Sequence, residues 1–161
     1  AGAKGIIVPM INTVKEAKEA IEATYYHPKG KRGVGFARAH NYGYNFNKYV
    51  NKESNKIQLY LQIESIDGIK NLEKILDLKN ISGTILGPYD LSSSLGVIGN
   101  LESSLVKNAI KKYEKISLKK RVSMGIHITD PNPSKVKSYY KKKYKLIASG
   151  TDMIFLGNSC N

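Results

Sequence analysis

The sequence has little cysteine, little arginine and no long apolar run. Its one cysteine, Cys160, cannot form a disulfide within the chain. No apolar stretch approaches the roughly 18 residues of a membrane-spanning helix. No basic segment followed by an apolar one marks a secretory leader. Together these features predict a cytoplasmic protein without a membrane segment.

The shortage of arginine bears on the strong positive charge. The formal net charge is +13, and 26 residues are lysine or arginine. Only Arg32, Arg38 and Arg121 are arginines, whereas readers of phosphate and base edges rely on the planar arginine fork. The lysines are scattered along segments with helical periodicity. We therefore expect solvated helix faces and no nucleic-acid partner, with a basic binding module as the alternative.

Strand-like and helix-like segments alternate along the 161 residues, a length typical of one domain. Short apolar runs predict strands at 5–10, 57–63, 82–87, 121–128 and 151–157. Helical periodicity predicts helices at 14–26, 46–53, 66–78, 101–120 and 133–150, with a loop at 27–45. Thr13, with Glu16 three residues later, predicts a capping box, and Ser65 is the expected N-cap of the next long helix.

This alternation predicts an α/β fold with a parallel sheet covered by helices. An open doubly wound sheet and a (β/α)8 TIM barrel are the two options. No glycine-rich turn follows the first strand to receive a dinucleotide. Polar residues cluster just after the strands, where barrel enzymes carry their chemistry. They are Asn12, Gln62, Glu64, Asp90, His127, Asp130 and Asn158. The barrel is therefore favoured.

Five strands are too few for a complete barrel. The sequence also begins close to a strand, without an initiator methionine, and ends shortly after another predicted strand. We expect residues 1–161 to be a partial barrel domain that lacks its N-terminal strands and last helix. Both edges of such a half-barrel would be open to pairing.

Two carboxylates in consecutive strand–helix units suggest a metal site. Gln62 and Glu64 lie two residues apart and so share one face of a strand. Asp90 follows the next strand, in the turn GPYD. Two carboxylates with no cysteine nearby and no histidine in ligand spacing suit a hard divalent cation such as Mg²⁺ or Mn²⁺. Water and a chelating 2-oxo acid would complete the coordination.

The same turn suggests an anion site, because the N–H groups of Tyr89 and Asp90 begin a helical turn. For each residue taken alone, a purely structural role remains open. Asp90 would serve as an N-cap, Glu64 as a strand-end residue in water, and His127 with Asp130 as a turn. Nothing specific is expected of His27 or His40.

The segments GIIVPMINTVKEAKEAIEATYYHPKGKRGVGFARAHNYG, LQIES and LGPYDLSSSLG together resemble the HpcH/HpaI family of class II pyruvate aldolases. The resemblance covers most of the chain in the right order. It implies a TIM barrel, of which this chain would supply about strands 4 to 8. It also implies reversible aldol cleavage of a 4-hydroxy-2-oxo acid to pyruvate and an aldehyde, without a Schiff-base lysine.

By the same resemblance, Glu64 and Asp90 are the ligands of the divalent cation, with Co²⁺ a further option beside Mg²⁺ and Mn²⁺. Gln62 resembles the residue that contacts pyruvate. The backbone amides of Tyr89 and Asp90 resemble those that hold its carboxylate. Tyr89 itself departs from the small residue usual at that position. No role is carried over to His127 or Ile128, where the family varies.

The resemblance also shows what is missing. The family's catalytic histidine, its aspartate partner and its substrate-binding arginine lie on earlier strands, so the base stays unassigned here. The family's final helix, used in oligomer packing, also has no predicted counterpart. We expect weak metal binding and no catalysis from these residues alone, and an active homo-oligomer when full length. The rival is a CoA-ester lyase of the citrate-lyase β-subunit type; a non-catalytic relic is a third possibility.

Overall fold

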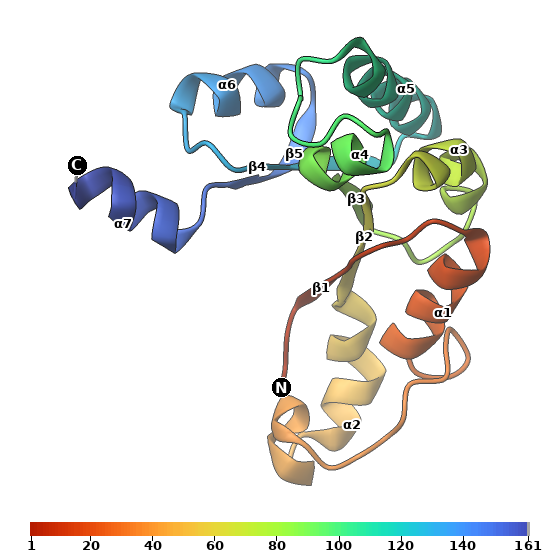
Figure 1. The fold of residues 1–161 in the computed structure, drawn as a ribbon. Coiled ribbons are helices and arrows are strands. Elements are labelled where there is room, and N and C mark those ends of the chain that lie inside the picture. Colours follow the sequence, from red (N-terminus) through yellow and green to blue (C-terminus); the bar gives the residue numbers. More distant parts are fainter. Residues whose placement is uncertain (161) are drawn as a thin grey trace.

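The computed structural model describes residues 1–160 and contains a five-stranded, fully parallel sheet (Figure 1). The strands are β1 (Gly5–Val8), β2 (Gln58–Ile63), β3 (Gly83–Leu86), β4 (Ser123–Ile128) and β5 (Tyr144–Ser149). They stand side by side in chain order, β1-β2-β3-β4-β5. A doubly wound sheet would reverse its strand order part-way, whereas this sheet never does. The α/β class with a parallel sheet is confirmed.

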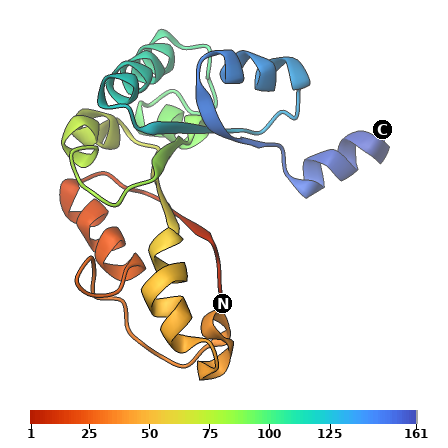
Figure 2. The ribbon, with the colours of Figure 1, turned by 180° about the vertical axis from the view of Figure 1, so that it is seen from behind.

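Helices connect each strand to the next, and one further helix follows β5. They are α1 (Val14–Thr24), α2 (Phe46–Lys48), α3 (Ile66–Ile75), α4 (Pro88–Ser94), α5 (Ser104–Lys120), α6 (Pro133–Lys141) and α7 (Asp152–Cys160). Figures 1 and 2 show α1, α3, α5 and α6 around the outside of the curved sheet. Within residues 1–160, no helix is both long and apolar enough to cross a membrane.

The core lies between the sheet and these outer helices. Along β2, Leu59, Leu61 and Ile63 are fully buried, whereas the alternating residues are partly or largely exposed. The buried set meets the apolar stripe of α3, which includes Ile69, Leu72 and Ile75. The sheet therefore has one face covered by helices and one face whose side chains are more accessible. That second face carries Gln62.

The predicted helix starts of α1 and α3 are confirmed. Thr13 accepts from the backbone N–H of Glu16, and the Glu16 carboxylate accepts from the N–H of Thr13. Ser65 accepts from the N–H of Gly68 and so caps α3. These two caps fix where the chain turns after β1 and β2, which is the edge of the sheet that holds the polar residues.

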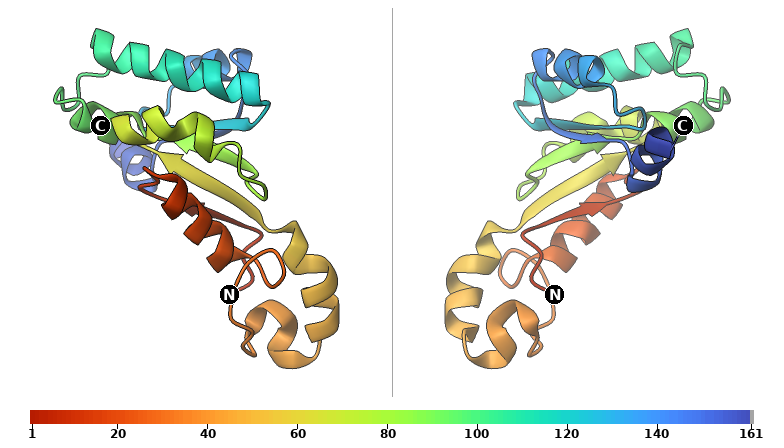
Figure 3. Two further views of the ribbon diagram at one scale, coloured as in Figure 1. Left: turned by 90° about the vertical axis from the view of Figure 1, so that its right-hand side faces the viewer. Right: turned by 90° about the vertical axis from the view of Figure 1, so that its left-hand side faces the viewer.

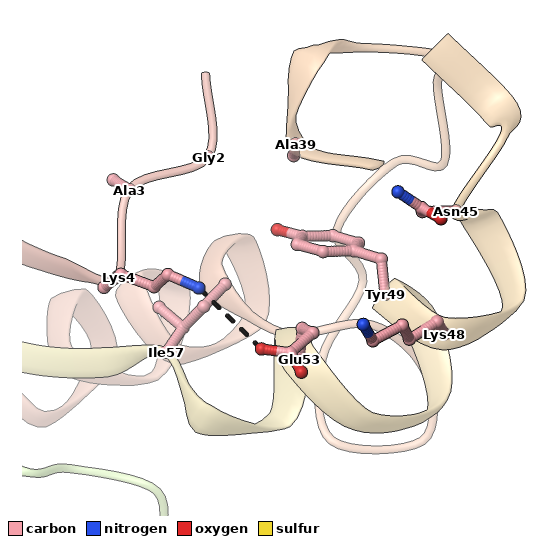
Figure 4. Close-up of a pocket in the computed structure, with 9 residues that line it drawn as sticks. All are labelled: Gly2, Ala3, Lys4, Ala39, Asn45, Lys48, Tyr49, Glu53 and Ile57. Carbon is pink, nitrogen blue, oxygen red and sulfur yellow. Dashed lines mark ion pairs between the residues drawn. The ribbon is translucent and has the colours of Figure 1, made fainter. Parts of the chain in front are cut away.

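A helical segment lies near the amino ends of β1 and β2. It confirms the helix predicted at 46–53 and replaces the later part of the loop predicted at 27–45. It comprises 3₁₀ turns at Arg38–Gly43 and Ser54–Lys56, the short α2, and a π-helical turn at Tyr49–Glu53. Figure 3 shows this segment extending from the same end of the sheet as the N-terminus. A cavity of about 310 Å³ lies between it and residues 2–4 (Figure 4). The Lys4–Glu53 ion pair crosses this cavity.

The C-terminal prediction was wrong. Helix α6 ends at Lys141, not Gly150, and residues 144–149 form β5, which pairs with β4. Lys143 ends the helix in a left-handed conformation with φ 70°, without the glycine that usually marks such a stop. The helical pattern of the lysine-rich run therefore continues in the sequence beyond the point where the helix ends and the strand begins.

The segment predicted as the last strand is a helix. Residues 152–160 form α7, so Asn158 lies within a helix and does not follow a strand. The N–H of Phe155 bonds to the Thr151 carbonyl, and the N–H of Ile154 to its hydroxyl. The expectation that no helix follows the last strand is thereby corrected. The strand was predicted because Met153, Phe155 and Leu156 form an apolar run typical of a buried strand. In the structure these three side chains are exposed.

Candidate active site

The register of the sheet brings the predicted site residues to one level. Gln62 pairs with Ile85, and Ile85 with Gly125. Two residues further along the strands, on the same face, lie Glu64, Gly87 and His127. All three stand at the carboxyl ends of their strands. The sequence predicted this clustering for Glu64 and His127, whereas Gly87 was not among the predicted site residues.

Glu64 is the buried centre of the cluster, with 5% of its surface exposed. Its Oε1 accepts a hydrogen bond of 2.7 Å from the backbone N–H of Met10. Its Oε2 accepts one of 2.6 Å from Nε2 of Gln62. The two donors hold the carboxylate plane in one orientation. Gln62 was predicted to touch a substrate; the structure shows it also orienting Glu64.

Gly87 leaves the space that this carboxylate needs. A Cβ built on Gly87 would lie 3.0 Å from both Cβ and Oε2 of Glu64. It would also lie 3.3 Å from Nε2 of Gln62. Such contacts are shorter than ordinary van der Waals separations, so a side chain here would push Glu64 or Gln62 away. The lack of a side chain at Gly87 therefore shapes the site.

The first turn of α4 follows Gly87 directly and carries Tyr89 and Asp90, both exposed. Among the described residues, the backbone N–H groups of Tyr89 and Asp90 donate to no protein acceptor. The first N–H to close the turn is that of Leu91, which bonds to the carbonyl of Gly87. Two unsatisfied donors thus stand beside the Asp90 carboxylate. The alternative role of Asp90 as an N-cap is excluded, because Gly87 holds that position.

The donor set suits a hard divalent cation. Glu64 and Asp90 form no ion pair with a lysine, arginine or histidine within residues 1–160. A buried carboxylate without a counter-charge is costly, and a bound cation would offset that cost. No group of three or more ligating side chains occurs in the described part of the chain. Glu64 follows β2 and Asp90 lies in the first turn after the neighbouring β3, so both carboxylates stand at the same edge of the sheet.

His127 is half-buried and also lines a cavity of about 460 Å³ between α5, α6 and the first turn of α4. Asp130, beyond it, pairs with Lys135 at 2.8 Å. The hydrogen bond from Lys135 to Asp130 raises the pKa of the Lys135 ammonium. Asp130 is therefore a partner of Lys135 in a surface turn, and it joins neither Glu64 nor Asp90.

The sequence model of the family described as HpcH/HpaI aldolase/citrate lyase matches residues 1–158. The chain belongs to this family. The match extends over the whole sheet, including β5 and most of α7, so the family assignment rests on more than the site motifs. The resemblance predicted from QIE and GPYDLS is confirmed.

Two curated family members show how far the likeness extends. The 4-hydroxy-2-oxo-heptane-1,7-dioate aldolase of Escherichia coli (strain ATCC 8739) is 33% identical over 159 residues, which are 98% of this chain and 60% of that protein. The 2-keto-3-deoxy-L-rhamnonate aldolase of Escherichia coli O9:H4 (strain HS) is 38% identical over 112 residues, 68% of this chain and 42% of that protein. The matched part of the chain thus spans less than two thirds of the length of each relative.

A solved structure of the family shares the fold. The HpcH/HpaI aldolase/citrate lyase family protein from Burkholderia cenocepacia J2315 superposes with a TM-score of 0.91 at 26% identity. The superposition covers 99% of this chain and 63% of that protein. The parallel sheet and its helices are therefore an arrangement found within a larger family member.

Proposed function

We propose that this chain forms the metal-binding part of a class II pyruvate aldolase, corresponding to about strands 4 to 8 of a TIM barrel. The complete enzyme would cleave a 4-hydroxy-2-oxo acid reversibly to pyruvate and an aldehyde. The observation that carries the proposal is the buried Glu64 carboxylate, which two donors orient and which has no ion-pair partner among residues 1–160. A bound Mg²⁺, Mn²⁺ or Co²⁺ would act as a Lewis acid toward the substrate's keto oxygen.

The residues of this chain would bind and orient the 2-oxo acid. Glu64 and Asp90 would hold the cation. The free N–H groups of Tyr89 and Asp90 would donate to the substrate carboxylate. Nε2 of Gln62 has a second hydrogen beyond the one given to Glu64, and this hydrogen is available to the keto oxygen. The Tyr89 ring, 47% exposed, would border the place where the 2-oxo acid binds.

Cleavage needs a base that these residues do not supply. The base takes the proton from the 4-hydroxyl, the C3–C4 bond breaks, and the aldehyde leaves. The bond's electron pair passes to the pyruvate enolate, which then gains a proton at C3. The family resemblance assigns the base to an upstream histidine and substrate binding to an upstream arginine. The complete enzyme is proposed to be a cytoplasmic homo-oligomer, on the resemblance and the sequence composition.

The second candidate is a CoA-ester lyase, because the family description also covers citrate lyase. The aldolase is favoured by the relative that matches 98% of this chain. The non-catalytic alternatives, a basic module or a relic, predict no turnover from any form of the protein. A basic module further predicts nucleic-acid binding with a steep salt dependence.

The complete protein provides the functional test. Incubated with Mg²⁺ or Mn²⁺, it should release pyruvate from 4-hydroxy-2-oxo acids, measured by coupled lactate dehydrogenase. A chelator should abolish release, and added metal should restore it. The 161-residue chain, assayed in parallel, should release none above background. Turnover of CoA esters but not of hydroxy-oxo acids by the complete protein would overturn the aldolase in favour of the lyase.

A further inference from the structure

The turn that follows β1 contains a residue, Met10, whose backbone conformation is not explained by the packing of its side chain. Met10 has φ 57°, in the left-handed region that is strained for a non-glycine residue. Its side chain is 57% exposed, so packing of the thioether does not hold the backbone there. The conformation must be imposed by contacts of the backbone and of neighbouring residues.

The consequence of this conformation lies at Glu64. The N–H of Met10 points across to β2 and donates to Oε1 of Glu64. The next N–H, that of Ile11, bonds to the carbonyl of Gln62 at 3.1 Å. Two successive amides of the turn therefore bind the end of β2. One of them reaches the carboxylate proposed to hold the cation.

Asn12 holds the turn in place. Its Nδ2 donates to the Met10 carbonyl at 3.0 Å, closing the left-handed residue within the turn. Its Oδ1 accepts from the Ser65 hydroxyl, and its carbonyl accepts from Nδ2 of Asn71 at 2.8 Å. Its N–H donates to the Glu16 carboxylate at 2.8 Å, a bond that lowers the pKa of Glu16. One residue thus joins β1, α1, the cap of α3 and the site.

We propose that Asn12 is a positioning residue for the metal site. It keeps Met10 in the left-handed conformation, so that the Met10 N–H orients Glu64 to receive a divalent cation. The proposal rests on the proposed function for the cation, but the backbone geometry can be tested without metal. Outer partners that orient a ligand commonly change metal affinity by about 10- to 100-fold when removed.

The experiment uses four forms of the chain beside wild type. Asn12→Ala removes the side-chain bonds. Asn12→Ala/Met10→Gly removes them but places at residue 10 the one amino acid that adopts positive φ without strain. Met10→Gly alone tests the glycine, and Asn108→Ala, an exposed change on α5, is the matched control. Amide hydrogen exchange at residue 10 and Mn²⁺ affinity, by electron paramagnetic resonance, are measured for each.

Asn12→Ala should accelerate exchange at residue 10 and weaken Mn²⁺ binding about tenfold. The double variant should recover both to within about threefold of wild type, because glycine restores the turn. Asn108→Ala should match wild type, and Met10→Gly is the reference against which the double variant is compared. Unchanged exchange and affinity in Asn12→Ala would overturn the proposal, as would a double variant no better than the single. If exchange follows this pattern while wild type binds no Mn²⁺, the metal function fails and the positioning of Glu64 stands.

Discussion

At the scale of single residues, the carboxylate of Glu64 is the central group of the candidate site. It is buried, and both of its oxygens accept hydrogen bonds. Those bonds reduce the cost of burial but do not neutralise the charge. On the proposed function, this charge is present to bind the cation. The price is a local reduction in stability when no cation is present.

Replacing this charge should therefore stabilise the metal-free chain. Glu64→Gln keeps the shape of the side chain. Its Oε1 still accepts from Met10, and the Gln62 amide must turn its oxygen toward the new NH2 group to keep the second bond. We expect the free energy of unfolding, measured with urea and a chelator, to rise by roughly 1 kcal/mol. Asp90→Asn, at an exposed position, should change it by less than about 0.5 kcal/mol. A clearly destabilised Glu64→Gln variant would show that the charge is compensated within the protein.

At the scale of elements, the site depends on the closeness of β2 and the β3–α4 turn. Gly87 permits this approach, since any Cβ there would contact Glu64 at 3.0 Å. This role could not be predicted from the sequence, because a simple bend before Pro88 explains the glycine equally well. Only the register of β2 and β3 shows that Gly87 stands opposite Glu64.

The close approach of Gly87 to Glu64 can be tested by adding a single methyl group at residue 87. Gly87→Ala should displace Glu64 or Gln62, lower Mn²⁺ affinity about tenfold and destabilise the chain by about 1–3 kcal/mol. Gly33→Ala is the matched control, because a Cβ at Gly33 meets nothing within 4 Å and its φ is not positive. Calorimetric titration with Mn²⁺ and urea unfolding provide the two readouts. Equal affinity in both variants would show that the turn tolerates a side chain.

The elements also show how far sequence reasoning reaches. The strand–helix alternation, the caps at Thr13 and Ser65, and the position of Gln62, Glu64 and Asp90 near strand ends were predictable, because each depends on local chemistry or on the period of a strand. The end of α6 and the identity of α7 were not. Lys143 adopts a left-handed conformation that no glycine signals, and the apolar face of α7 resembles a buried strand. The part played by Met10 depends on a contact across 54 positions of sequence.

At the scale of the whole molecule, the sheet is open along β1 and β5. Ile6 and Ile7 of β1 are 39% and 46% exposed, although their apolar side chains favour burial. The chain matches 60% of the length of the 4-hydroxy-2-oxo-heptane-1,7-dioate aldolase. We propose that further strands of a complete barrel pair with these edges and carry the base. On this account, the chain can hold the cation but cannot move the proton.

The most direct test of the account is therefore metal binding by the chain itself. Mn²⁺ titration followed by electron paramagnetic resonance should show one weak site in wild type. Glu64→Gln and Asp90→Asn should each lower its affinity by about tenfold or more, because each removes one of two protein ligands. Asp67→Asn, an exposed carboxylate on α3 that pairs with Lys70, should leave it unchanged. Equal Mn²⁺ affinity in all four proteins would contradict the account.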